Sequence, residues 1–261
     1  MTTWDLIIAL FYHIDEQLHD LPKHLEAHLW PSEVVILGVL HALKGVGHRA
    51  FHRWLTRASR PLLPRLPERT RLFRLFKTPQ AWTQAFLASP TVLGVIDAYG
   101  LALIHPSREG RSSQQSGRKG LSQHRWIVGG NLCLLLNQYG VVVGWDGATA
   151  HGPDNTCQWL LRQGDGRLLG VSDTAFHAAE GAPANLTLGH RGEWEARRLV
   201  ETVLSMLTLV GHVKQVMHRG WADVQARLAF TMAAFNVLVR WHGLFPDASG
   251  VVPRSIAAFR R

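Results

Sequence analysis

Two aspartates stand where predicted strands end, and their residue type and position suit the binding of a cation. Asp97 follows the apolar run Leu-Gly-Val-Ile, and Asp173 follows the closely similar run Leu-Gly-Val-Ser. Carboxylates at the carboxyl ends of neighbouring strands converge on the crevice where open α/β sheets bind ligands. A single aspartate at such a position is usually a turn or capping residue, so the two together carry more weight than either one alone.

Glu201 is the third candidate, and it lies in the middle of the predicted helix EARRLVETVLSML. Apolar residues cover most of the circumference of this helix, as expected of a buried helix. A carboxylate there is costly unless it is paired or bound to a cation. Arg197 lies one turn earlier on the same face, so an Arg197–Glu201 ion pair is the structural alternative to metal binding, although the two are compatible.

Together these three carboxylates form a set of hard oxygen ligands, the kind that Mg²⁺ or Mn²⁺ prefers. Two such ions about 3.5–4 Å apart can activate the attacking oxygen and stabilise the leaving oxygen of a phosphoryl transfer. We therefore expect Asp97, Asp173 and Glu201 to be catalytic and to hold two Mg²⁺ or Mn²⁺ ions.

Positive charge is concentrated in two parts of the chain, which carries a net charge of +9. Residues 47–77 hold nine arginines and lysines against one acid, and residues 105–125 hold five against one. Such clustering favours a polyanionic partner, because neutralised phosphates release counterions; a solvated basic surface is the alternative. The residues expected to contact DNA are Arg49, Arg53, Arg57, Arg60, Arg108, Arg111, Arg118, Lys119, Arg125, Arg197 and Arg198.

The elements that position these side chains change character near residue 90. Residues 1–90 are predicted to be helical, with one helix capped by Ser32 and ended by Gly45, and a second helix over 48–60. On the second helix, four arginines follow one another at offsets of four, four and three, which places them on one stripe: Arg49, Arg53, Arg57 and Arg60. That stripe suits a phosphate backbone, and it also suits the solvated face of a helical bundle.

Beyond residue 90, short apolar runs predict strands. The predicted order is a strand at 91–104, a polar loop at 106–124, a hairpin at 126–147, a short helix at 153–163, a strand at 167–173 and helices at 194–213 and 221–241. A mixed sheet flanked by helices satisfies this order, which predicts an α/β fold. We expect a helical DNA-binding region at 1–90, a catalytic domain at 91–245 and a tail at 246–261.

The remaining features indicate a cytoplasmic protein without a membrane segment. No run of about 18 apolar residues occurs, and the first residues do not read as a signal peptide. Cys133 and Cys157 are expected to form neither a disulfide nor a zinc site, which favours a reducing compartment. Most tryptophans are expected in the core, but Trp126 and Trp145 lie near the predicted sheet and are candidates for stacking on bases.

The chain resembles bacterial insertion-sequence transposases of the DDE superfamily, whose catalytic domain has a ribonuclease-H-like fold. The resemblance covers most of the chain and is carried by the segments SEVVILGVLHALKGVGHRAFHRWL, VIDAYGLAL, GVSDTAF and, most clearly, RRLVETVLSMLT. The arrangement Trp194-x2-Arg197-x3-Glu201 is similar to a Tyr-x2-Arg-x3-Glu-x6-Lys signature. Here a tryptophan replaces the tyrosine, and Thr208 occupies the lysine position.

This resemblance implies cleavage of double-stranded DNA at transposon ends by water, followed by attack of the released 3′-hydroxyl on target DNA. It also implies that Asp97, Asp173 and Glu201 are the metal ligands, and a homodimer is expected for pairing two ends. The chain departs from the family at Ala175-Phe176, where Gly-Tyr is common. It departs again in the 28-position interval between Asp173 and Glu201, which leaves little room for the usual strand and basic segment. A transposase remnant that only binds DNA and a metal-dependent nuclease without joining activity are the alternatives.

Overall fold

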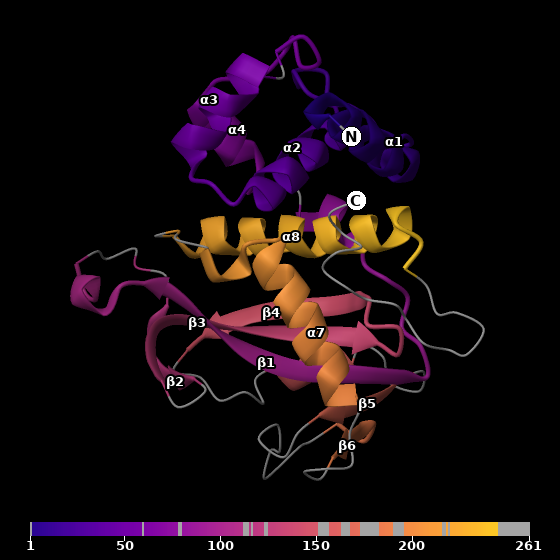
Figure 1. Ribbon diagram of the computed structural model, residues 1–261, viewed down its shortest axis with the longest axis vertical. Coiled ribbons are helices and arrows are strands. Elements are labelled where there is room, and N and C mark those ends of the chain that lie inside the picture. The colour runs from indigo at the N-terminus through magenta and orange to yellow at the C-terminus, as the bar shows by residue number, and fades with distance from the viewer. Residues whose placement is uncertain are drawn as a thin grey trace.

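The structure is a computed structural model that describes residues 2–58, 60–77, 80–111, 115, 117–122, 125–150, 157–162, 168–172, 183–189, 196–215, 218 and 220–244 (Figure 1). Its helices are α1 (Thr3–Leu18), α2 (Pro31–Lys44), α3 (His48–Ala58), α4 (Arg69–Leu75), α5 (Gln80–Gln84), α6 (Trp159–Arg162), α7 (Ala196–Leu209) and α8 (Trp221–Trp241). Its strands are β1 (Leu93–Ile104), β2 (Arg118–Ser122), β3 (Arg125–Asn137), β4 (Val142–Thr149), β5 (Leu169–Ser172) and β6 (Leu186–Leu188). These elements confirm the predicted α/β class.

The first part of the chain is helical, as predicted, and the bounds of α2 follow from its end residues. The helix begins at Pro31, and Trp30 rather than Ser32 occupies the N-cap position, where its backbone N–H donates to the Glu33 carboxylate at 2.7 Å. Proline suits the first helical position because its backbone nitrogen has no hydrogen to leave unbonded there. At the other end, Gly45 takes the left-handed conformation with a φ of 63°, which glycine adopts without a steric penalty.

The strands form one mixed six-stranded sheet with β1 and β3 at its centre. The strand β3 is antiparallel to β1 and to β4, whereas β1 is parallel to β5, and β5 is parallel to β6. The short strand β2 pairs with the first part of β3, on the same edge that β4 occupies further along. The hairpin predicted at 126–147 and the strands predicted at 91–104 and 167–173 are therefore present.

The helix α8 lies between the N-terminal helices and the sheet (Figure 1). Phe230 and Ala233 pack into a core formed mainly by α1, α2, α3 and α4, whereas Leu228 and Met232 pack into a second core with α7 and the sheet. Because α8 contributes to both cores, it is buried along most of its length. The predicted division at residue 90 stays a prediction, and the two regions share this helix.

Two strands occupy segments that carry no strand signal in the sequence. The strand β2 lies within the expected polar loop at 106–124, so that expectation is wrong for residues 118–122. Its Arg-Lys-Gly-Leu-Ser sequence has little strand propensity, and its backbone pairing with β3 holds it in place. The strand β6 lies between Asp173 and Glu201, where little room for a strand was expected, and it pairs with β5.

The expectation of two unpaired cysteines is wrong. Cys133 on β3 and Cys157 just before α6 form a disulfide across 24 positions of sequence, and both belong to the buried cluster beneath the sheet. The spacing of the two cysteines in the sequence does not indicate this disulfide, because it is the fold of the β3–β4 hairpin that brings the two segments together. The expected cytoplasmic location therefore loses the support of unpaired cysteines. Among the described residues, no single helix could cross a membrane, and α2 and α3 pass that test only as a pair bent by 115°.

Candidate functional site

Asp97 lies inside a strand rather than at the end of one, which corrects the sequence-based expectation. The strand β1 continues through Ala98 and Tyr99 to Ile104. In the antiparallel register Asp97 is opposite Leu134 of β3, whose side chain belongs to the core under α7 and α8. Since cross-strand partners point to the same side of a sheet, Asp97 faces α7. One of its carboxylate oxygens accepts a hydrogen bond from the backbone N–H of Ala98 at 2.8 Å.

Glu201 is exposed, so the expectation that it lies in a buried helix is wrong. The helix α7 is amphipathic, and its buried side consists of Val200, Val203, Met206 and Leu207. Glu201 is on the other side, where its charge keeps contact with water. Burial therefore does not require a bound cation at this residue, so its neighbours decide what it could bind.

Asp97 and Glu201 line the same pocket, which has a volume of about 410 Å³. The helix α7 crosses the face of the sheet over β1 and so brings the two carboxylates together from opposite halves of the chain (Figure 1). The remaining lining residues are Tyr99, Leu204, Ser205, Thr208, Leu209 and Lys214. The structure therefore supplies an open hollow, lined by both polar and apolar side chains, with two acids in its wall.

Lys214 is a residue of this pocket that sequence reasoning missed. It lies in the short 3-10 helix Val213–Gln215 after α7, and its ammonium nitrogen is 5.3 Å from the centre of the Tyr99 ring. Thr208, at the position where the resembling family has a lysine, lines the same pocket. A lysine is thus present in the pocket, contributed by a different position of the chain. No sequence signal marked it, because its place depends on the turn that follows α7.

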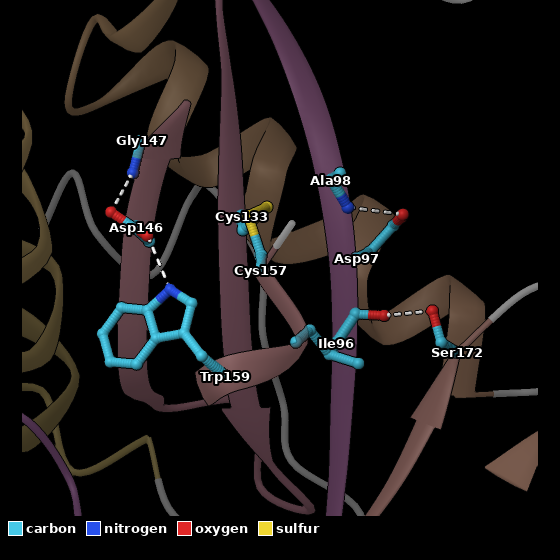
Figure 2. The surroundings of a disulfide bond; sticks show 9 residues. All are labelled: Ile96, Asp97, Ala98, Cys133, Asp146, Gly147, Cys157, Trp159 and Ser172. Atoms are coloured by element: carbon cyan, nitrogen blue, oxygen red, sulfur yellow. Dashed lines mark hydrogen bonds between the residues drawn. A yellow bond between two sulfur atoms is a disulfide. The ribbon is translucent and has the colours of Figure 1, made fainter. Parts of the chain in front are cut away.

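Asp173 lies outside the described residues, so the structure does not place the third predicted ligand. The last described residue of β5 is Ser172, whose hydroxyl donates to the backbone oxygen of Ile96 at 2.9 Å (Figure 2). This bond ties the carboxyl end of β5 to the residue just before Asp97. Within the described part of the chain, no three acidic, histidine or cysteine side chains are grouped to hold a metal ion.

Asp146, an acid that could compete for a metal, is on the opposite face of the sheet. It pairs with Cys133, which in turn pairs with Ala98, so its side chain points away from the face that Asp97 occupies. Its carboxylate accepts hydrogen bonds from the Trp159 indole N–H and from the Gly147 backbone N–H, both at 2.7 Å (Figure 2). Asp146 therefore has a structural role between β4 and α6.

The basic residues expected to contact DNA are exposed wherever the structure describes their side chains. Three of the four arginines of the predicted stripe lie on α3, but Arg60 follows the end of that helix and so is not part of the stripe. A second exposed group surrounds β2 and the start of β3, and Arg198 is exposed on α7. The Arg197 side chain lies outside the described part, so the proposed ion pair with Glu201 stays a prediction. The second group consists of Arg108, Arg111, Arg118, Lys119 and Arg125.

Comparison of the chain with protein-family models, curated proteins and solved structures gave no match. The interpretation of the pocket therefore depends on its own residues and on the topology that positions them.

Proposed function

We propose that this chain is a transposase of the DDE type, which cleaves DNA strands at transposon ends and joins them to target DNA. The observation that carries the proposal is the common pocket of Asp97 and Glu201. These are two of the three residues assigned as metal ligands from their sequence context alone, and they are 104 positions apart. The exposed basic residues on α3 and around β2 supply surfaces suited to DNA phosphates.

The order and direction of the strands support a ribonuclease-H-like catalytic domain. Without the short strand β2, the sheet order is β4-β3-β1-β5-β6, with three antiparallel strands followed by two that are parallel to β1. The helix α7, which carries Glu201, lies across the sheet at β1, which carries Asp97. In this proposal the third acid is Asp173, the residue that follows Ser172 in the sequence.

The donor atoms of the pocket fit a hard divalent cation. Carboxylate oxygens from Asp97 and Glu201 are the ligands that Mg²⁺ and Mn²⁺ prefer, and none of the described residues that line the pocket supplies a sulfur or an imidazole. Such ions supply activation of the attacking oxygen and stabilisation of the leaving oxygen. The chain itself contributes the orientation of Asp97 through its bond to Ala98, and a positive charge at Lys214 that attracts a DNA phosphate. As a DNA enzyme the protein is proposed to act in the cytoplasm, as a homodimer that pairs two ends.

The test is a strand-cleavage and strand-transfer assay with duplexes that carry the inverted repeats flanking the gene. Wild-type protein with Mg²⁺ is expected to cut the repeat end and join it to a target duplex. Asp97→Asn and Glu201→Gln should abolish both reactions but retain DNA binding. Asp146→Asn is the matched control, because it changes an acid on the opposite face of the sheet, and it should retain both reactions.

The outcomes separate the proposal from its two alternatives. Cleavage without joining would favour a metal-dependent nuclease, and DNA binding without either reaction would favour a transposase remnant. Wild-type activity in both Asp97→Asn and Glu201→Gln would remove the pocket from the reaction.

A further inference from the structure

The hairpin formed by β2 and the first part of β3, residues 118–122 and 125–129, carries an exposed apolar pair. We refer to it as the hairpin arm, and it lies at one side of the sheet (Figure 1). Trp126 is 65% exposed and Leu121 is 57% exposed, and the two are direct cross-strand partners. Trp145, the other tryptophan near the sheet, instead packs against the core. Adjacent exposed apolar side chains of this size are typical of a binding surface.

The charge around Trp126 is positive. The Lys119 ammonium nitrogen is 5.2 Å from the centre of the Trp126 ring. Arg118 and Arg125 are also exposed on the arm, but the register puts them on its opposite face. Neither strand of the arm contains an acidic residue. A flat aromatic surface among cations suits a partner that has both negative charge and flat rings, and nucleic acid has both.

The register places Trp126 on the same face of the sheet as Asp97. Asp97 is opposite Leu134, and Trp126 is eight residues before Leu134 on β3, so both side chains point to one side. Eight strand residues span about 26 Å, at roughly 3.3 Å per residue. A DNA strand held at the carboxylate pocket can therefore reach the arm within a few nucleotides to one helical turn.

From these observations we infer that Trp126 stacks on an unpaired nucleobase of a bound DNA strand, while Lys119, on the same face of the arm, contacts a phosphate of that strand. The inference rests on the proposed function, since it assigns a further contact to the same DNA. An unpaired base is required because the faces of bases inside a duplex are already covered by their neighbours. Stacking on aromatic side chains is the usual way in which proteins hold such bases.

The experiment compares the binding of two DNAs, a fully paired duplex and the same duplex with a three-nucleotide single-stranded tail that contains 2-aminopurine. We expect tighter binding of the tailed DNA and quenching of the 2-aminopurine fluorescence. Trp126→Ala should lower the affinity for tailed DNA by about tenfold, remove the quenching, and leave the affinity for the paired duplex unchanged. Trp126→Phe should retain most of both effects, because the ring is kept.

Two further variants separate stacking from charge and from chance. Trp30→Ala is the matched control. Trp30 is 49% exposed and has the Lys23 ammonium nitrogen at 5.4 Å from its ring, but it lies among the N-terminal helices. This variant should bind both DNAs with wild-type affinity. Lys119→Ala should weaken the binding of both DNAs and reduce the slope of log affinity against log salt by about one unit. Trp126→Ala should leave this slope unchanged.

The results that would overturn the inference differ from those that would overturn the proposed function. Equal affinity of the wild type for both DNAs, or an equal effect of Trp126→Ala on both, would overturn the stacking role while the proposed function stands. If the wild type binds neither DNA, the proposed function fails and the stacking role fails with it.

Discussion

The guanidinium of Arg227 donates from Nη2 to the backbone carbonyl oxygen of Ala42 at 2.8 Å, and from Nη1 to the carbonyl oxygen of His41. Both acceptors belong to the last turn of α2, whose carbonyl groups have no partner within the helix. Arg227 is in the middle of α8 and is 5% exposed, and its burial lowers its pKa to about 10. A buried cation on α8 thus caps α2 and joins the N-terminal helices to the layer that covers the sheet.

Arg227→Met is expected to lower the free energy of unfolding by about 3 kcal/mol, because it leaves two buried carbonyl groups without donors. The measurement is urea denaturation followed by circular dichroism. Arg240→Met is the control, since Arg240 is exposed near the end of the same helix, and it should cost much less. Equal losses in the two variants would show that the contact with α2 contributes little.

Acidification is expected to destabilise the protein through histidines packed beside Arg227. Burial lowers the pKa of His41 to about 2 and that of His218 to about 4, with Arg227 and His48 adding to the effect. Because the unfolded chain takes up these protons near pH 6.5 and the folded protein does not, the free energy of unfolding should fall as the pH drops from 6.5 to 4. Each of the two histidines contributes up to about 1.4 kcal/mol per pH unit.

Urea denaturation at pH 7, 6 and 5 measures this dependence. His218→Gln should reduce its slope by about one proton, whereas His28→Gln, which changes an exposed histidine, should not. If the slope is the same in the wild type and in His218→Gln, the cluster around Arg227 does not control the acid sensitivity.

Replacement of both Cys133 and Cys157 by alanine is expected to lower the free energy of unfolding by about 3 kcal/mol, since the disulfide closes a loop of 24 positions. Reduced wild-type protein should show a similar loss. Thiol titration of the denatured, unreduced protein tests the bond itself: a value near zero is expected, and two thiols per chain would contradict it.

Replacement of Arg49, Arg53 and Arg57 by alanine is expected to weaken DNA binding and to reduce the slope of log affinity against log salt by up to about 2.7 units. Three arginine-to-lysine changes at the same positions keep the charge and are the matched control, so they should preserve the slope. Fluorescence anisotropy with a labelled duplex over several salt concentrations gives both slopes. If alanine and lysine variants behave alike, α3 does not contact phosphates.

Most of the fold could be predicted where local signals agree with the tertiary structure. The α2 helix ends before Gly45 and the β3–β4 hairpin turns after Asn137, because glycine and short apolar runs mark these places. The strands β2 and β6 could not be predicted, since their stability comes from pairing with β3 and β5 rather than from their own residues.

The candidate site could be predicted only in part. The sequence contexts of Asp97 and Glu201 single out two residues that line one pocket, but they predict the wrong surroundings for both: Asp97 is inside a strand, and Glu201 is exposed. Lys214 and Tyr99 join the pocket only because α7 crosses β1 and the chain then turns back. Such long-range packing leaves no local pattern in the sequence.

The most direct test of the central claim is a calorimetric titration with Mn²⁺, which measures the affinity of the protein for the ion. It is carried out on the wild type, Asp97→Asn, Glu201→Gln and Asp146→Asn. If Asp97 and Glu201 hold a divalent cation between β1 and α7, each of the first two variants should weaken Mn²⁺ binding by at least about tenfold, and Asp146→Asn should bind as the wild type does. Unchanged Mn²⁺ affinity in both Asp97→Asn and Glu201→Gln would contradict the claim.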